Sequence, residues 1–217
     1  NIQQGYGLTE TSPILTTLDE DIHIHAMETG EHDILKAAGR PLVGIDMRIV
    51  DADGKEVPTG EGGEVVVRGP NVTAGYLKKP EENEEAFRDG WFHTGDVGKM
   101  DENGFMYLLD RKKDVIITGG ENVYSSEVEA VLYQHSDVVE CAVVGVPDEK
   151  FGEALFAAIV GRPGVEITES DIIEHCRTRI GGYKIPRRMA FVEELPKSAM
   201  GKILKTEIRQ TYGEKTI

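Results

Sequence analysis

Two short segments in the first half of the chain carry side chains suited to nucleotide chemistry. The first is "QGYGLTETS", residues 4–12, which contributes Gly5, Tyr6, Gly7, Thr9 and Glu10. Glycines allow close backbone approach, an aromatic face can stack on a base, a hydroxyl can donate to phosphate, and a carboxylate can hold Mg²⁺. By itself, the segment also fits a turn whose tyrosine packs on the core.

The second segment is "GWFHTGDVG", residues 90–98, in which Asp96 follows Thr94 and Gly95. The pattern predicts a tight turn that ends on a carboxylate. Such a carboxylate can accept two hydrogen bonds and therefore suits the vicinal diol of a ribose. The alternative is a purely structural Asx turn before a hairpin, which this segment taken alone favours.

Two further segments lie in the second half. Residues 110–129, "DRKKDVIITGGENVYSSEVE", combine a basic cluster, a strand, a Gly119-Gly120 turn that leaves room for a slender ligand, and a helix. Residues 195–205, "LPKSAMGKILK", place Lys202 directly after Gly201 on a stretch with the composition of a loop. Taken alone, Lys202 is an ordinary solvated cation.

The elements that must position these residues differ between the two halves. Up to about residue 110, β-branched runs joined by Asp-Gly and Gly-Gly predict hairpins, one of them turning at Asn103-Gly104, and residues 80–88 predict a short acidic helix. Beyond that point two amphipathic helices alternate with apolar runs, which predicts a small α+β domain with buried strands. A capping box of Ser126 and Glu129 is expected to begin the first of these helices, at about 126–135.

Composition narrows the function classes. The chain has 217 residues, 39% hydrophobic and 29% charged, as in an ordinary soluble globular protein. Its net charge of −15 argues against nucleic acid as a partner. Residues 1–110 hold 9 of the 24 basic but 22 of the 39 acidic side chains, so the cations concentrate in the second half, where an anionic ligand would fit.

Other features bear on location and metal binding. No apolar run approaches the ~20 residues of a membrane span, and no secretory signal opens the chain, which starts without Met and is interpreted as a piece of a longer protein. Cys141 and Cys176 are expected to be core thiols in a reducing, cytoplasmic compartment; a disulfide between them has no support. His23, His25 and His32 lie in a polar segment expected to be a loop and lack a fourth ligand at zinc spacing.

The order and spacing of the four segments resemble the adenylate-forming superfamily of acyl-CoA synthetases, luciferases and peptide-synthetase adenylation domains. The likeness rests on "YGLTE", "GWFHTGD", "DRKKDVIITGGENV" and the Gly-Lys pair at 201–202, and it spans nearly the whole chain. It implies an α+β architecture. Residues 1–111 would be the C-terminal part of a large ATP- and acyl-binding domain, mostly β hairpins or a small barrel, and residues 112–217 a small mobile C-terminal domain.

The resemblance also implies a two-step reaction. A carboxylic acid would attack ATP to give an acyl-adenylate and pyrophosphate, and CoA would then give a thioester and AMP. The wording of residues 119–160 looks most like CoA ligases for fatty or aromatic acids, with ATP, Mg²⁺ and CoA as required molecules and peripheral membrane contact left open. The family's phosphate loop and most of its acyl pocket lie upstream, so residues 1–217 alone are expected to be inactive.

Residue roles follow from the same resemblance. Those for the first step are adenine stacking by Tyr6 between Gly5 and Gly7, phosphate contact by Thr9, Mg²⁺ ligation by Glu10, ribose binding by Asp96 with Arg111, and charge neutralisation by Lys202. Those for the second step are a hinge at Lys113, a pantetheine path along Gly119 and Gly120, and CoA nucleotide binding at Tyr183 and Lys184. Two alternatives stay open: an adenylation domain that loads a carrier protein, and a non-catalytic module that senses nucleotide.

Overall fold

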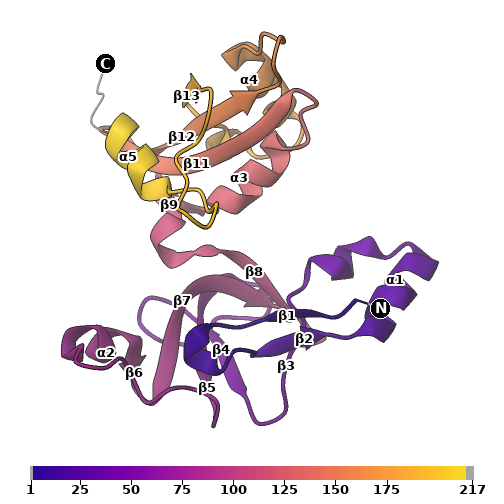
Figure 1. Ribbon diagram of the computed structural model, residues 1–217, viewed down its shortest axis with the longest axis vertical. Coiled ribbons are helices and arrows are strands. Elements are labelled where there is room, and N and C mark those ends of the chain that lie inside the picture. Colours follow the sequence, from indigo (N-terminus) through magenta and orange to yellow (C-terminus); the bar gives the residue numbers. More distant parts are fainter. Residues whose placement is uncertain (1, 214–217) are drawn as a thin grey trace. The chain divides into compact units, whose positions relative to one another are not determined.

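The computed structural model describes residues 2–213, and the chain divides into two compact units (Figure 1). Unit 1 is Asn1–Lys112 and unit 2 is Lys113–Ile217. Both mix helices with antiparallel sheet, so the predicted α+β class is confirmed. Within residues 2–213, no helix is both long enough and apolar enough to cross a membrane.

Unit 1 is built on two sheets. One is three-stranded, in the order β1 (Gln4–Tyr6), β2 (Thr16–Leu18), β3 (Arg40–Pro41). The other has the order β4 (Asp46–Val50), β5 (Gly63–Arg68), β7 (Trp91–Met100), β6 (Phe87–Arg88), with β8 (Met106–Arg111) also paired to β7. The remaining elements are η1 (Thr9–Thr11), α1 (Glu20–Thr29), η2 (His32–Lys36) and α2 (Pro80–Ala86).

The predicted hairpins of unit 1 are confirmed. Strands β7 and β8 pair antiparallel from Met100–Met106 to Asp96–Arg111, and the turn between them contains Gly104 with φ 77°. The apolar positions of β4, β5, β7 and β8 point into one core, formed by side chains that include Ile49, Val65, Val67, Phe92 and Met106. The predicted acidic helix is α2, which opens with Pro80.

The prediction of a loop around the histidines is wrong, because residues 20–29 form helix α1. Glu20 and Asp21 lie in the first turn after Asp19, where carboxylates interact favourably with the positive end of the helix dipole. Gly30 ends the helix with φ 78°. Ala26 is its one fully buried side chain, so the helix has almost no apolar stripe to detect.

Unit 2 wraps one sheet in helices. The strand order is β10 (Glu121–Val123), β9 (Ile116–Thr118), β12 (Gly152–Gly161), β11 (Val138–Asp148), with β13 (Arg188–Phe191) parallel to β12. The helices are η3 (Lys112–Asp114), which begins at the last residue of unit 1, α3 (Ser125–Leu132), α4 (Glu169–Arg177), η4 (Gly182–Lys184) and α5 (Lys205–Gly213).

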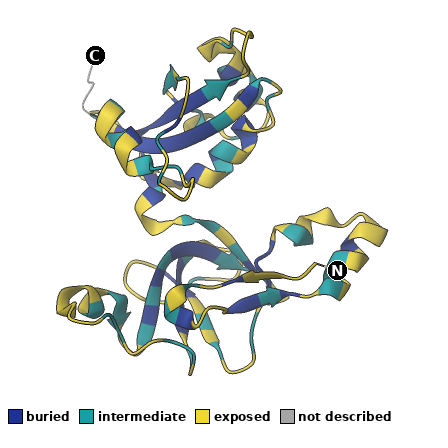
Figure 2. Ribbon diagram, viewed as in Figure 1, coloured by how far each residue is buried: buried dark blue, intermediate teal, exposed yellow. Residues whose placement is uncertain are grey.

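The central hairpin β11–β12 is buried on both faces, as its near-continuous apolar runs predicted (Figure 2). Alternate side chains point to opposite faces of a strand. Val143 and its alternates pack with α3 and α4, whereas Val144 and its alternates pack with Leu195 and with Ile208 of α5. Cys141 and Cys176 are free thiols in the first of these cores, as expected, and burial raises the pKa of the Cys141 thiol to about 12.

The predicted capping box of Ser126 and Glu129 is wrong. Helix α3 begins one residue earlier, with Tyr124 at the N-cap and no side-chain cap. The Glu129 side chain has other partners: its Oε1 lies 2.7 Å from Lys205 Nζ and accepts the Val143 N–H at 2.8 Å. A capping box does form at α4, between Thr168 and Asp171.

Candidate active site

Asp96 is the centre of a hydrogen-bonded cluster in unit 1. Tyr6 Oη donates to Asp96 Oδ2 at 2.7 Å, and Arg111 donates from NH1 to Asp96 Oδ1 at 2.7 Å. The Asp96 side chain is 10% exposed, whereas that of Arg111 is 53% exposed. Two residues predicted from separate segments, Tyr6 and Asp96, are thus in direct contact although 90 positions separate them.

The local backbone explains why the carboxylate is held inward. The predicted tight turn is wrong, since Asp96 lies within strand β7; Gly95 has φ 70°, and the pairing with β8 is irregular at Val97. Strand β7 also bulges against β5, where the register shifts between Glu64–Val97 and Val66–His93. Thr94 holds this bulge, because its hydroxyl donates to the Val65 carbonyl at 2.8 Å and accepts the Asp96 N–H at 3.1 Å. The bulge turns Asp96 toward Tyr6.

Tyr6 behaves as a buried hydrogen-bond donor. Burial raises the pKa of its hydroxyl well above the ordinary value, and the nearby Asp96 carboxylate raises it further, so the phenol stays protonated. Its ring belongs to the apolar core of unit 1, as in the packed-tyrosine alternative. Adenine stacking by Tyr6 stays a prediction.

The glycines beside Tyr6 are explained by the chain's own backbone. A Cβ at Gly7 would lie 1.8 Å from the Pro13 carbonyl oxygen, and one at Gly5 would lie 2.9 Å from Ile14 Cδ1. Segment 13–16 therefore packs directly on segment 5–7. These glycines shape the wall on which Tyr6 sits, whether or not a ligand also approaches it.

Glu10 is the residue of this unit best suited to a magnesium ion. It lies in η1, is partly buried, and accepts a hydrogen bond on Oε1 from Tyr76 Oη at 2.9 Å. Within residues 2–213, its Oε2 has no partner, and no three His, Cys, Asp or Glu side chains converge as a metal site. A single carboxylate still fits Mg²⁺, which commonly takes one protein carboxylate with substrate phosphates and water. Thr9 beside it is exposed.

Tyr76 was missed by sequence reasoning. Asn83 fixes its backbone from α2, because Asn83 Oδ1 accepts the Tyr76 N–H at 2.6 Å and Asn83 Nδ2 donates to the Tyr76 carbonyl at 2.8 Å. Burial raises the pKa of the Tyr76 hydroxyl, as does its bond to Glu10. No local motif marks a tyrosine 66 positions from its carboxylate partner.

Lys202 lies in unit 2 on an ordered turn between β13 and α5. Ser198 donates its N–H to the Lys202 carbonyl at 2.8 Å, a bridge joins Lys197 to Ile203, and Gly201 has φ 78°. The Lys202 side chain is exposed, and in the described residues its ammonium has no partner. The stretch expected to be a loop therefore has a hydrogen-bonded backbone, from which the Lys202 side chain extends into solvent.

The residues predicted for the second step all lie in unit 2. Lys113, the predicted hinge, is the first residue after the boundary between the units. Gly119 and Gly120 form the turn between β9 and β10 with φ 60° and 87°, and both are exposed.

Tyr183 and Lys184 lie together in η4. Tyr183 is 45% exposed. Lys184 Nζ donates to Glu127 Oε1 at 2.6 Å and Oε2 at 2.7 Å. Partial burial disfavours the charged ammonium, but the Glu127 carboxylate outweighs this and raises the pKa of Lys184. A phosphate bound by Lys184 would have to share that ammonium with Glu127.

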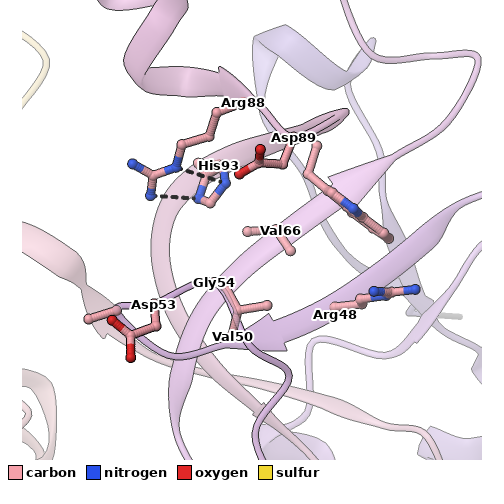
Figure 3. Close-up of a pocket in the computed structure, with 10 residues that line it drawn as sticks. Arg48, Val50, Asp53, Gly54, Val66, Arg88, Asp89 and His93 are labelled. Atoms are coloured by element: carbon pink, nitrogen blue, oxygen red, sulfur yellow. Dashed lines mark hydrogen bonds between the residues drawn. The ribbon is translucent and has the colours of Figure 1, made fainter.

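A separate pocket of about 270 Å³ lies in unit 1 (Figure 3). Its wall includes His93 and Arg88, which are hydrogen-bonded to each other, and Trp91, over whose ring the Arg48 guanidinium lies at 4.6 Å. None of the site residues predicted from the sequence lines it.

Comparisons with known proteins bear on the family of the chain. Residues 1–77 match the model of the AMP-binding enzyme family, and residues 127–202 match that of the AMP-binding enzyme C-terminal domain. A feruloyl-CoA synthase from Amycolatopsis is 44% identical over 97% of this chain and 41% of its own length. The chain thus spans about two-fifths of that relative.

Two solved structures are similarly close. ATP-bound MatB from Rhodopseudomonas palustris superposes with a TM-score of 0.85 and 37% identity over 98% of this chain and 41% of its own. The o-succinylbenzoate CoA synthetase MenE from Bacillus subtilis, in complex with the acyl-adenylate OSB-AMP, superposes with a TM-score of 0.84 and 37% identity. The match covers 95% of this chain and 40% of the MenE chain. The chain therefore belongs to the adenylate-forming family of AMP-binding enzymes and includes that family's C-terminal domain.

Proposed function

We propose that the whole protein is an AMP-forming acid–thiol ligase that activates a carboxylic acid with ATP and transfers the acyl group to CoA. The observation that carries the proposal is the 44% identity to a feruloyl-CoA synthase along 97% of the chain. The geometry supports it, because the carboxylates predicted for ribose and Mg²⁺ are each oriented by a tyrosine hydroxyl.

In the first step, unit 1 belongs to the larger ATP- and acyl-binding domain. Asp96 accepts the ribose hydroxyls on lone pairs left by its bonds to Tyr6 and Arg111, which fix its orientation. Thr9 contacts phosphate, and Glu10 holds Mg²⁺, which when bound neutralises phosphate charge. Lys202 supplies the cation for the developing charge between the carboxylate and the α-phosphate.

In the second step, unit 2 moves as the small mobile domain. Because the Lys202 turn has an ordered backbone, Lys202 is delivered and withdrawn by rotation of the unit about Lys113 rather than by flexing of the turn. Gly119 and Gly120 leave an open backbone for the pantetheine arm, and Tyr183 with Lys184 receives the nucleotide of CoA. Two buried free thiols support a cytoplasmic location.

The proposed acid is aromatic. The relative and the structural neighbour named for their substrates are a feruloyl-CoA synthase and an o-succinylbenzoate CoA synthetase. Fatty acids are the second substrate class to test, because the wording of residues 119–160 also resembles ligases for those acids.

The test is a product analysis with the purified whole protein, ATP, Mg²⁺, CoA and a panel of cinnamic, benzoic and fatty acids. We expect acyl-CoA and AMP in equal amounts, with aromatic acids preferred. AMP and pyrophosphate without acyl-CoA would point to a carrier-protein thiol. ADP as product, or no acid-dependent product, would reject the proposal.

A matched pair of variants assigns the ribose site. Asp96→Asn should raise the KM for ATP, because a ribose contact persists from the ground state to the transition state. Asp53→Asn changes an exposed carboxylate of the same unit and should leave that KM unchanged. Equal KM values in both variants would remove Asp96 from the nucleotide site.

A further inference from the structure

The segment that joins the units is held on its unit 1 side by a buried carboxylate. Lys112 Nζ, at the last residue of unit 1, donates to Glu64 Oε2 at 2.9 Å. The Glu64 side chain, on strand β5, is only 8% exposed. The Lys112 side chain is 54% exposed, so solvent screens this bond on the lysine side, while the carboxylate end is fixed by its burial.

Glu64 is itself fixed by its neighbours. His93 Nδ1 lies 3.0 Å from Glu64 Oε2, and Arg88 Nε donates to His93 Nε2 at 3.1 Å. Arg88 NH2 also lies 3.1 Å from His93 Nδ1. A proton on Nδ1 serves the contact with Glu64 and leaves Nε2 to accept from Arg88 Nε, whereas a proton on Nε2 leaves Nδ1 to accept from Arg88 NH2. Burial raises the pKa of Glu64, but the bonds from His93 and Lys112 more than offset it, and the net direction is downward. Lys112 is thus bonded to a buried side chain of unit 1 that has a further partner in His93.

The unit 2 side is held by one arginine. Arg209 NH2 donates to Asp114 Oδ1 at 2.6 Å and to the Lys113 carbonyl at 3.2 Å. The Asp114 side chain is 10% exposed. Arg209 therefore binds the first two residues after the boundary, Lys113 through its carbonyl and Asp114 through its carboxylate.

Arg209 belongs to the helix that follows the Lys202 turn. In α5, Ile208 is buried, and Tyr212 stacks on Phe156 of β12 with ring centroids 4.5 Å apart. At the start of the helix, Lys205 Nζ lies 2.7 Å from Glu129 Oε1 and donates to Ser125 Oγ at 2.7 Å. Helix α5 therefore connects the exit of the linking segment to the Lys202 turn within one packed unit.

We propose that Glu64 and Arg209 are positioning residues that bracket the hinge and confine its pivot to the link between Lys112 and Lys113. Each anchor lies within its own unit, so neither has to break when the units rotate. When rotation is confined to the bond between Lys112 and Lys113, unit 2 rotates as a rigid body. The bonds of Arg209 then make α5 and the Lys202 turn move together with the start of unit 2. The bearing on catalysis rests on the proposed function; the bracket itself does not.

The test measures the linking segment directly, in the chain without substrates. Arg209→Met should raise amide exchange at residues 113–116 at least about tenfold, since a bond to a charged group is lost, and should leave residues 108–112 unchanged. Lys112→Met should raise amide exchange at residues 108–112 and leave residues 113–116 unchanged. Arg177→Met and Lys55→Met remove exposed cations without a partner in the described residues and serve as controls.

A second readout follows the units themselves. Dyes on cysteines introduced at the exposed Glu61 and Glu166 report the distance between units by single-molecule energy transfer, and the buried Cys141 and Cys176 leave labelling selective. Both anchor variants should broaden the distance distribution, and both controls should leave it unchanged. Neither measurement requires catalytic turnover. An inactive protein would therefore refute the proposed function but would not affect the proposal for Glu64 and Arg209.

The proposal is overturned if folded Arg209→Met exchanges amides at residues 113–116 no faster than Arg177→Met does. It is also overturned if folded Lys112→Met exchanges amides at residues 108–112 no faster than Lys55→Met does, or if the distance distribution stays unchanged. Where a methionine variant loses its native circular dichroism, Arg209→Lys and Glu64→Gln replace it. Arg209→Lys keeps the charge but replaces the planar guanidinium, whose NH2 bonds both acceptors, with an ammonium on a shorter side chain. Glu64→Gln keeps the shape of the acceptor for Lys112 without its charge. The same criteria apply to these variants.

Discussion

The bond between Tyr6 and Asp96 should stabilise unit 1 through a coupling that can be measured as a double-mutant cycle. Tyr6→Phe removes the donor and Asp96→Ala the acceptor of a 2.7 Å charge-assisted bond between buried side chains. Such a bond contributes about 1.5–3 kcal/mol, and leaving the buried Tyr6 hydroxyl unpaired costs about 1–3 kcal/mol. The bond from Arg111 adds little, ~1 kcal/mol or less, because that guanidinium is half exposed.

From these values, Asp96→Ala should lower the free energy of unfolding of unit 1 by about 2–4 kcal/mol and Tyr6→Phe by about 1–3 kcal/mol. The double variant should lose less than the sum, by roughly 1.5–3 kcal/mol. Trp91 is the one tryptophan of the chain and lies on β7, so urea unfolding followed by its fluorescence reports unit 1.

Asp53→Asn, at an exposed carboxylate of the same unit, should stay within about 0.5 kcal/mol of wild type. Additive losses, with a coupling below about 0.5 kcal/mol, would refute the view that Tyr6 orients Asp96.

Three further variants test other parts of the account. Lys113→Pro in the whole protein should spare adenylate formation and slow thioester formation in single-turnover assays, because proline restricts φ at the hinge; equal rates in both steps would place the hinge elsewhere. Gly7→Ala should cost unit 1 about 2 kcal/mol or more in urea unfolding, because the new Cβ would meet the Pro13 carbonyl at 1.8 Å; wild-type stability would disprove the close approach. The folded pKa of Glu64 lies below its ordinary value of 4.5, so ionised Glu64 stabilises unit 1 fully above that pH and loses this effect as the pH falls through the folded pKa. The unfolding free energy of Glu64→Gln should therefore fall less steeply below pH 4.5 than that of wild type, and parallel curves would contradict the assignment.

Strands β11 and β12 show what the sequence could predict about the fold. Their runs are apolar at both odd and even positions, and the structure covers both faces with helices, so a local pattern was sufficient. Helix α1 shows the limit. Ala26 is its one buried residue and its first turn is acidic, and neither feature produces an apolar stripe.

The site divides in the same way. Asp96, Glu10 and Lys202 were predicted from the combination of the four segments, because each of their segments taken alone also fits a structural role. Their partners were not predictable locally, because Tyr76 reaches Glu10 across 66 positions and Tyr6 reaches Asp96 across 90. Arg111 is intermediate: a hairpin turning at Asn103-Gly104 brings it close to Asp96, but the irregularity at Val97 sets the register.

The proposed activation of a carboxylic acid with help from Lys202 is tested by carboxylate-dependent exchange of pyrophosphate into ATP by the whole protein, compared between wild type and Lys202→Ala. Exchange should require the acid and should fall by a factor of ~10² or more in Lys202→Ala, the scale of one lost transition-state charge contact. Lys55→Ala should match wild type, and thioester formation from supplied acyl-adenylate should be largely spared in Lys202→Ala. Absence of exchange with every acid tested would reject acid activation by this protein, and exchange unaffected by Lys202→Ala would reject the role of Lys202.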